Sequence, residues 1–285
     1  MQQFEFHSAG SIEEVASLLA ERGSRCKVIA GGTDLIPALR NGDLHPDLVV
    51  NLLEIDSLRG IRERDGVVWV GPLTTFADMV ESEVLGRCFP LLVQAAASVG
   101  GPQIRNRGTI GGNIANASPA ADVLPASLAL DAELSIFSRS SGEKRLSLSE
   151  AIEKPYRIRF RPDEFLTGIT FRKLSTGTRS AFEKLGRRNA LARARMNLSL
   201  VLQQDAAGKV SDIRIVPGAV TSVAKRMKKA EEGLLGKKPD ALCVEEASSR
   251  LVEEMTEMTG RRWSTEYKVP VLGNIFRRML KGIIV

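Results

Sequence analysis

The chain has 285 residues, 43% of them hydrophobic, which is the balance of a soluble globular protein and not of a disordered or fibrous one. No apolar run approaches the roughly 18 residues needed to cross a bilayer. The N-terminus also lacks the basic start and the apolar stretch of a secretory signal. We therefore expect a cytoplasmic protein without membrane contact, built as two domains or as one large domain with an appendage.

The formal net charge is +6, and the basic excess is concentrated in residues 157–195, which hold eleven Lys and Arg against three Asp and Glu. Such a surface can serve a partner protein, an anionic cofactor or nucleic acid. Aromatic residues make up only 5% of the chain, too few for a platform on which bases would stack. We therefore favour a protein partner or an anionic cofactor and expect no nucleic-acid binding.

Cysteines and histidines are too few and too scattered to carry chemistry. Cys26, Cys88 and Cys243 are isolated, no Cys-x-x-Cys occurs, and His7 and His45 lie far apart. The sequence therefore predicts no metal site in this chain, no iron–sulfur ligation and no disulfide framework. It also predicts no catalytic triad built on histidine.

In chain order, the first element is a helix that opens at a Ser11–Glu14 capping box and stops at Gly23. A strand at 27–30 follows, then a helix that Thr33 and Asp34 cap and that runs to about Arg40. Further along we expect strands at 48–51, 67–70, 133–138 and 164–172, and helices at 75–82, 85–98 and 122–130. The stretch Gly100–Pro119 is so rich in Gly and Pro that we expect a long functional loop.

The remaining part begins with a linker at 174–178. Alternating residues predict strands at 198–202 and 210–216, and apolar periodicity predicts helices at about 223–235, 240–258 and 264–281. Strands followed by helices indicate a layered α+β arrangement.

Two glycine pairs suggest an anion site. Gly31-Gly32 precedes the Thr33-Asp34 cap, and Gly111-Gly112 lies in a second segment that leads to a helix start at Asp122. Glycine lets backbone N–H groups approach a ligand closely, and such groups bind phosphate. Neither segment matches the P-loop or the Rossmann fingerprint. Two such segments could hold one diphosphate between them.

The motifs KVIAGGTDLIP (27–37) and GPQIRNRGTIGGNIANASPAADVLPASLALDAEL (101–134) resemble the FAD-binding medium subunit of molybdenum hydroxylases, the family of xanthine dehydrogenase and carbon monoxide dehydrogenase. FEKLGRR, KAEEGLLGK and STEYKVPVLGNIFRRML extend the resemblance over the whole chain. It implies an α+β fold with a vanillyl-alcohol-oxidase-type FAD-binding domain at 1–173, with subdomains at about 1–55 and 56–173. A smaller α+β C-terminal flavoprotein domain follows at 179–285.

The resemblance also implies which residues bind FAD. Residues 27–34, the first glycine segment, match the family's first FAD loop. Residues 109–113, the second glycine segment, match its second loop. Asp122 matches an acid that binds the sugar chain, Leu166 an apolar contact, and Lys184 a basic position that one residue of slip would move to Glu183. The implied contacts are Lys27, Val28, Ile29, Ala30, Gly31, Gly32, Thr33, Asp34, Thr109, Ile110, Gly111, Gly112, Asn113, Asp122, Leu166 and Lys184.

By the same resemblance, this subunit receives electrons from a partner's iron–sulfur clusters and passes them from reduced FAD to NAD or another acceptor. The molybdenum cofactor belongs to a large partner subunit and the [2Fe-2S] clusters to a small one, with a dimer of heterotrimers as the assembly. No side chain of this chain need be catalytic. The alternative is a self-contained FAD-dependent reductase of a small molecule. Residues 190–197, unusually rich in Arg, and 219–224, without a Pro-rich turn, depart from the family pattern.

Overall fold

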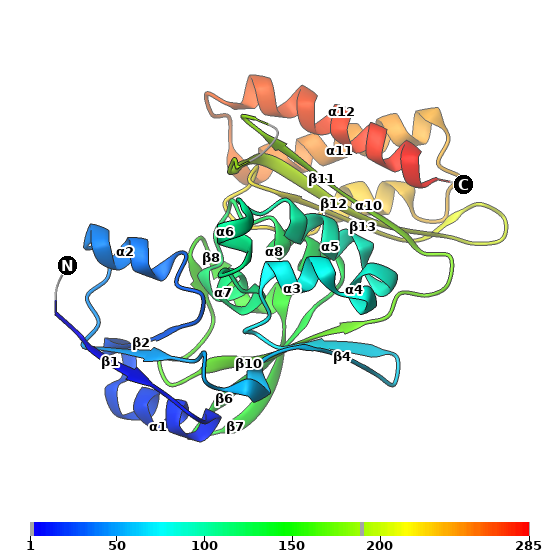
Figure 1. The fold of residues 1–285 in the computed structure, drawn as a ribbon. Coiled ribbons are helices and arrows are strands. Elements are labelled where there is room, and N and C mark those ends of the chain that lie inside the picture. The colour runs from blue at the N-terminus through cyan, green and yellow to red at the C-terminus, as the bar shows by residue number, and fades with distance from the viewer. Residues whose placement is uncertain (1–2, 189–190, 285) are drawn as a thin grey trace. The chain divides into compact units, whose positions relative to one another are not determined.

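The computed structural model describes residues 3–188 and 191–284, so part of the basic segment 157–195 lies outside the described residues. The chain forms two compact units, each assembled from three stretches of sequence (Figure 1). The first unit comprises residues 1–82, 101–117 and 131–172. The second comprises 83–100, 118–130 and 173–285. The units therefore interleave along the sequence.

A small parallel sheet carries the first glycine pair. Its strand order is β1-β3-β2, with β1 at Glu5–Ser8, β2 at Cys26–Ile29 and β3 at Leu48–Asn51. Helix α1 (Ile12–Arg22) buries Val15, Ala16 and Leu19 in the same core as the central strand β3. β2 is an edge strand, and the first glycine pair lies between its end and the start of α2 (Leu35–Asn41).

A five-stranded antiparallel sheet forms the rest of the first unit's framework. Its order is β4-β5-β10-β6-β7. The strands are β4 Ile61–Arg64, β5 Val67–Val70, β6 Glu133–Ser138, β7 Gly142–Ser147 and β10 Phe165–Arg172. Shorter elements in this unit are α3 Phe76–Glu81, α9 Leu148–Ala151, β8 Ile152–Lys154 and β9 Arg157–Ile158.

The stretch Gly100–Pro119 is not the continuous loop that its composition predicts. It contains α6 (Pro102–Arg105) and α7 (Ile110–Asn116). Thr109 caps α7 by accepting a hydrogen bond from the Gly112 N–H, and Ile110 and Ile114 are buried. A side-chain cap and tertiary burial therefore outweigh the low helix propensity of two adjacent glycines.

The second unit is a three-stranded antiparallel sheet with helices on both faces. β11 (Arg179–Gly186), β12 (Ala194–Gln204) and β13 (Val210–Gly218) lie in that order. One face carries α10 Lys228–Leu234, α11 Ala241–Thr259 and α12 Thr265–Ile283, and Figure 1 shows α12 running along this sheet. α5 Pro90–Ala97 and α8 Val123–Ala129 contact the same strands. Met196, Leu198, Leu200 and Leu202 alternate along β12 into the helical core.

The elements expected from sequence differ from the structure mainly at their ends. The helix expected at 85–98 is two helices, α4 (Glu83–Cys88) and α5, because Pro90 cannot continue the first and starts the second. The helix expected at 223–235 begins only at Lys228. Strand β11, with half-buried residues along most of its length, was not expected at all. None of the helices in residues 3–188 and 191–284 is both long and apolar enough to cross a membrane.

Candidate FAD site

The two glycine segments lie against each other in the first unit. A Cβ placed on Gly31 would lie 1.7 Å from the carbonyl oxygen of Arg107 and 3.1 Å from the Gly108 nitrogen. Only glycine allows the two backbones to approach so closely. Gly108 directly precedes Thr109, the cap of α7, so the first segment packs onto the entrance of the second. The glycine pattern in the sequence does not predict this close approach of the two backbones.

Backbone hydrogen bonds fix the second segment to residues 72–76. The N–H of Ile110 donates to Thr74 O and that of Gly111 to Pro72 O, each at 3.0 Å, and the Phe76 N–H donates to Gly108 O. Gly111 is buried, and a Cβ there would lie 2.5 Å from both the Cβ and the carbonyl oxygen of Pro72. The Gly112 N–H donates a hydrogen bond to the Thr109 hydroxyl oxygen at 3.0 Å.

These bonds bear on the phosphate hypothesis. The N–H groups of Gly111 and Gly112 donate to protein acceptors, so a diphosphate would have to share these donors. Both N–H groups serve the local fold. Gly111 packs against Pro72 at a distance that leaves no room for a Cβ, and the Gly112 N–H completes the cap of α7. Gly112 differs from Gly111 in being half-buried, so one face of it remains accessible.

The backbone N–H groups of the glycines in the first glycine segment, unlike those in the second, are not bonded to the described part of the protein. Within residues 3–188 and 191–284, no acceptor receives a hydrogen bond from the N–H of Gly31, Gly32 or Thr33. All three residues are half-buried, and Gly32 has φ 73°, in the left-handed region. The Ile36 N–H closes the following turn on Gly32 O at 3.0 Å. Three consecutive backbone donors without protein partners are the arrangement that binds oxyanions.

Asn113, in the second glycine segment, carries an acceptor without a partner. Its N–H is bonded to Thr109 O, but its side-chain oxygen Oδ1 is buried and has no hydrogen-bond partner in the described part of the chain. A buried polar atom left unpaired costs about 1–3 kcal/mol, and a bound ligand donor would remove that cost. Leu166 lies in β10 opposite Ile136 and is only 6% exposed, so the structure places it in the sheet's core.

Asp122 and Lys184 lie in the second unit and contact each other. Lys184 Nζ lies 2.6 Å from Asp122 Oδ2 and also donates to Ser98 O at 2.8 Å. Asn197 Nδ2 donates to Asp122 Oδ1 at 3.0 Å. Both charged side chains are largely buried. The neighbouring Glu183 pairs with Arg278 instead, so the basic position beside Asp122 is Lys184.

Burial dominates the electrostatics of this pair. The pKa of Asp122 is raised by burial, although the charge of Lys184 and hydrogen bonds from Lys184, Asn197 and Ser98 lower it in part. Asp122 stands at the N-cap of α8 but makes no side-chain cap bond. The carboxylate is therefore held by Lys184 and Asn197, and sequence reasoning missed Asn197 because its role depends on packing between β12 and α8.

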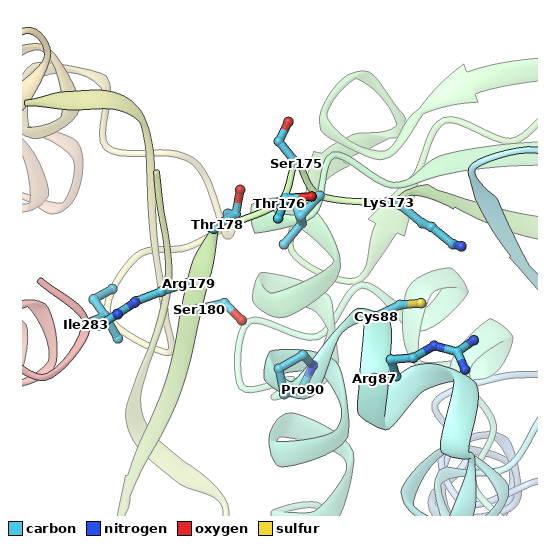
Figure 2. Close-up of a pocket in the computed structure, with 12 residues that line it drawn as sticks. Arg87, Cys88, Pro90, Lys173, Ser175, Thr176, Thr178, Arg179, Ser180 and Ile283 are labelled. Carbon is cyan, nitrogen blue, oxygen red and sulfur yellow. The ribbon is translucent and has the colours of Figure 1, made fainter. Parts of the chain in front are cut away.

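A separate hollow of about 630 Å³ lies in the second unit (Figure 2). Its lining includes the three cations Arg87, Lys173 and Arg179. In Figure 2, Arg87 and Lys173 extend to one side, beside Cys88, whereas Arg179 extends toward Ile283 on the other. The three cations point in different directions, so they do not together form a binding site for one anion. The lining residues are Arg87, Cys88, Pro90, Lys173, Leu174, Ser175, Thr176, Gly177, Thr178, Arg179, Ser180 and Ile283.

Comparison with known families matches both parts of the chain. Residues 2–171 match the FAD binding domain in molybdopterin dehydrogenase, and residues 180–283 match the CO dehydrogenase flavoprotein C-terminal domain. The expected α+β fold, with an FAD-binding part followed by a C-terminal flavoprotein part, is confirmed.

Individual relatives cover nearly the whole chain. The carbon monoxide dehydrogenase medium chain of Hydrogenophaga pseudoflava is 30% identical, over 98% of this chain and 96% of that one. A solved structure of carbon monoxide dehydrogenase from the same organism, lacking the Mo-pyranopterin moiety of its cofactor, matches with a TM-score of 0.92 and 30% identity, over 98% of this chain and 96% of that chain. The xanthine dehydrogenase FAD-binding subunit of Escherichia coli O157:H7 is 27% identical over 98% of this chain and 95% of its own length. The chain therefore belongs to the family of FAD-binding medium subunits of molybdenum hydroxylases, which are oxidoreductase subunits of multi-subunit complexes.

Proposed function

We propose that this chain binds the diphosphate of FAD at its first glycine segment and relays electrons within a molybdenum hydroxylase complex. The observation that carries the proposal is the contact of Gly31 with Arg107, which joins the two glycine segments. Among the described residues, the N–H groups of Gly31, Gly32 and Thr33 have no protein acceptor. Bound FAD supplies the redox chemistry, taking electrons from iron–sulfur clusters of a partner subunit and yielding them to NAD or another acceptor.

The two segments have different tasks in this proposal. The N–H groups of Gly31, Gly32 and Thr33 in the first glycine segment donate to phosphate oxygens. Binding costs little conformational entropy, because the fold already fixes the direction of these donors. Asn113 Oδ1, which is buried and has no partner among the residues that the structure describes, accepts a hydrogen bond from the cofactor. Thr109, Ile110 and Gly111 position Asn113 by capping and anchoring α7.

The remaining family-derived contacts are part of the same proposal. Lys27, Val28, Ile29 and Ala30 lead along the half-exposed edge strand β2 into the first segment, and Asp34 follows it. Leu166, Asp122 and Lys184 are proposed as FAD contacts by resemblance to the family. The contact that Asp122 and Lys184 make with each other holds both side chains in one orientation in a buried setting.

The partners are proposed by the same route. A large subunit would carry the molybdenum cofactor, a small subunit the [2Fe-2S] clusters, and two such heterotrimers would form the cytoplasmic assembly. The carbon monoxide dehydrogenase and xanthine dehydrogenase relatives bear names of multi-subunit enzymes, which supports this assignment.

Anaerobic titration of the purified complex tests the proposal. Flavin absorbance near 450 nm should be present, and added NADH should bleach it and then produce the electron paramagnetic resonance signal of reduced iron–sulfur clusters if NAD is the acceptor. Bleaching by an artificial electron donor but not by NADH would select another acceptor. A complex without flavin, or a chain with no affinity for FAD, would contradict the assignment.

A further inference from the structure

The second unit carries a surface in which positive charges gather around two exposed aromatic rings. It is formed by the start of β12 and by the connection from α11 into α12. We call it the basic–aromatic face; its residues are Arg193, Arg195, Arg261, Arg262, Trp263, Tyr267 and Lys268. Trp263 is 90% exposed and Tyr267 is 44% exposed.

Contacts between the two segments join Arg195 to the connection into α12. Arg193, Arg261 and Trp263 are assigned to the face as sequence neighbours of these residues. The Arg195 guanidinium lies over the Tyr267 ring, 5.8 Å from its centroid. The pKa of Lys268 is lowered, first by burial and then by the positive charges of Arg262 and Arg195, which places all three cations within electrostatic reach of one another. Lys268 Nζ is held by the carbonyl of Ala219 at 2.7 Å, and the Arg262 N–H by the Thr265 hydroxyl at 2.8 Å.

The cations of this face have no acidic partner among the described residues, whereas two arginines elsewhere in the unit do. Arg277 pairs with Glu245 at 2.8 Å, and Arg226 pairs with the buried Glu231 at 2.9 Å. In contrast, no carboxylate of residues 3–188 and 191–284 forms an ion pair with any of the five cations of the face. The one acid within 259–268 is Glu266, which is exposed and makes no such pair. Like charges gathered on one surface repel one another, and acidic groups of a partner would relieve that repulsion.

We propose that the basic–aromatic face docks onto an acidic surface of a partner subunit in the complex. Tryptophan, tyrosine and arginine are the residues that most often dominate binding energy at protein interfaces, and Trp263 is the most exposed large hydrophobic residue described. Acidic groups opposite the face would speed association and fix its orientation. The inference deepens the proposed function, on which it rests for the existence of a partner.

Nucleic acid would also be attracted by positive charge, but the face offers it little else. Single strands need several stacking rings in series, whereas this face has one fully exposed ring and the chain has only 5% aromatic residues. A partner protein with a carboxylate-rich patch and a pocket for Trp263 is the better match.

The test uses the full chain, tagged and purified from its own cells as the complex. Two variants change the face: Arg261→Glu with Arg262→Glu reverses charge, and Trp263→Ala removes the exposed ring. Two controls make the same changes elsewhere in the unit, at exposed positions: Lys209→Glu with Lys238→Glu, and Leu242→Ala, whose residue is 77% exposed. Native mass spectrometry and size-exclusion chromatography at increasing salt report assembly, and flavin absorbance reports FAD binding.

We expect the face variants to keep FAD and to assemble at least about tenfold more weakly, and the controls to assemble as the wild type does. An Arg262→Lys variant then supplies an amine that a zero-length carbodiimide should join to an Asp or Glu of the partner. Face variants that assemble normally would overturn the inference, as would linkage only within this chain or equal sensitivity of DNA oligonucleotide binding to the same changes. A wild-type chain that holds FAD but has no partner would overturn it while leaving FAD binding intact; a colourless complex would instead overturn the proposed function.

Discussion

The two glycine pairs of the first unit look alike in sequence and differ in what their backbones do. At the first pair the N–H groups of Gly31, Gly32 and Thr33 have no acceptor in the described chain, whereas at the second pair the N–H groups of Gly111 and Gly112 are bonded to Pro72 and Thr109. A glycine pair therefore does not by itself identify phosphate donors. What decides is whether the protein has already used the N–H groups.

The same distinction applies to the acid and base that the family resemblance assigns to FAD. Asp122 and Lys184 already hold each other at 2.6 Å, and Asn197 occupies the second carboxylate oxygen of Asp122. These groups resemble the second glycine pair, because their interactions are satisfied within the protein. The first pair is the region with open donors, and variants that separate the two classes sharpen the contrast.

The largest effect is expected at Gly31. Gly31→Ala puts a methyl group against the Arg107 carbonyl, and neither backbone can rotate away as a side chain would. We expect a loss of about 4 kcal/mol or more in the free energy of unfolding and at least about a tenfold loss of bound FAD. Gly10→Ala is the control, because its nearest neighbour is the end of the Glu14 side chain at 3.9 Å. Urea unfolding and flavin content check both; a Gly31→Ala chain with normal stability would show that the two segments do not pack as described.

The second effect concerns the buried pair and depends on pH. Lys184→Met leaves Asp122 buried without its cation, which should lower the free energy of unfolding by about 3 kcal/mol at neutral pH. Burial has already raised the folded-state pKa of Asp122, and removal of Lys184 raises it further. A raised carboxyl pKa gives stability that is present below the unfolded-state pKa and is lost as pH rises through the folded-state pKa.

The deficit of Lys184→Met should therefore shrink as the pH falls from neutrality toward the unfolded-state pKa of an aspartate, because Asp122 becomes neutral by protonation. The double variant Asp122→Asn with Lys184→Met carries neither charge and should recover most of the stability at neutral pH. Urea titrations at several pH values measure this. A deficit that stays constant with pH would mean that the charge of Asp122 is not what Lys184 balances.

A smaller effect is expected at Gly32. Its φ of 73° costs a residue with a side chain about 1–2 kcal/mol, and a Cβ would meet Ile36 and Ile29 side chains at 3.2 and 3.3 Å, which can shift. Gly32→Ala should therefore fold, with stability reduced by that amount, and should bind FAD about tenfold more weakly as its N–H is turned away. Equilibrium FAD titration checks it, and FAD binding equal to wild type would remove Gly32 from the proposed donors.

How far the sequence predicts this molecule depends on whether a feature is local. Helix α1 follows from Ser11 and Gly23, and strands β12 and β13 with the helices after them follow from periodicity, whereas β11 does not. Helix α7 could not be predicted from the sequence. Its stability comes from the burial of Ile110 and Ile114, and the helix contacts strands that are distant in sequence. The contact of Gly31 with Arg107 and the bond of Gly111 to Pro72 involve backbone carbonyls, which leave no signature in the side chains.

The smallest change in stability, and the sharpest test of the contrast, is expected at the second glycine pair. Gly112→Ala adds a methyl group 3.1 Å from Thr109 Oγ1, a tight contact, while alanine gains about 1 kcal/mol of helix propensity over glycine within α7. These effects nearly cancel, so the free energy of unfolding should change by less than about 0.5 kcal/mol. Because Gly112 is half-buried beside Asn113, the same methyl group should still weaken FAD binding if the cofactor passes there.

Gly111→Ala provides the matched comparison, one residue away. Its methyl group would meet both the backbone and the ring of Pro72 at 2.5 Å, so stability should fall by about 3 kcal/mol, and FAD binding should fall only as the fold is lost. The pair of variants separates a glycine that the fold requires from one that a ligand requires. Unchanged FAD affinity in a stable Gly112→Ala chain would leave the first glycine segment as the sole backbone site for the diphosphate, and would assign both glycines of the second segment to packing and capping alone.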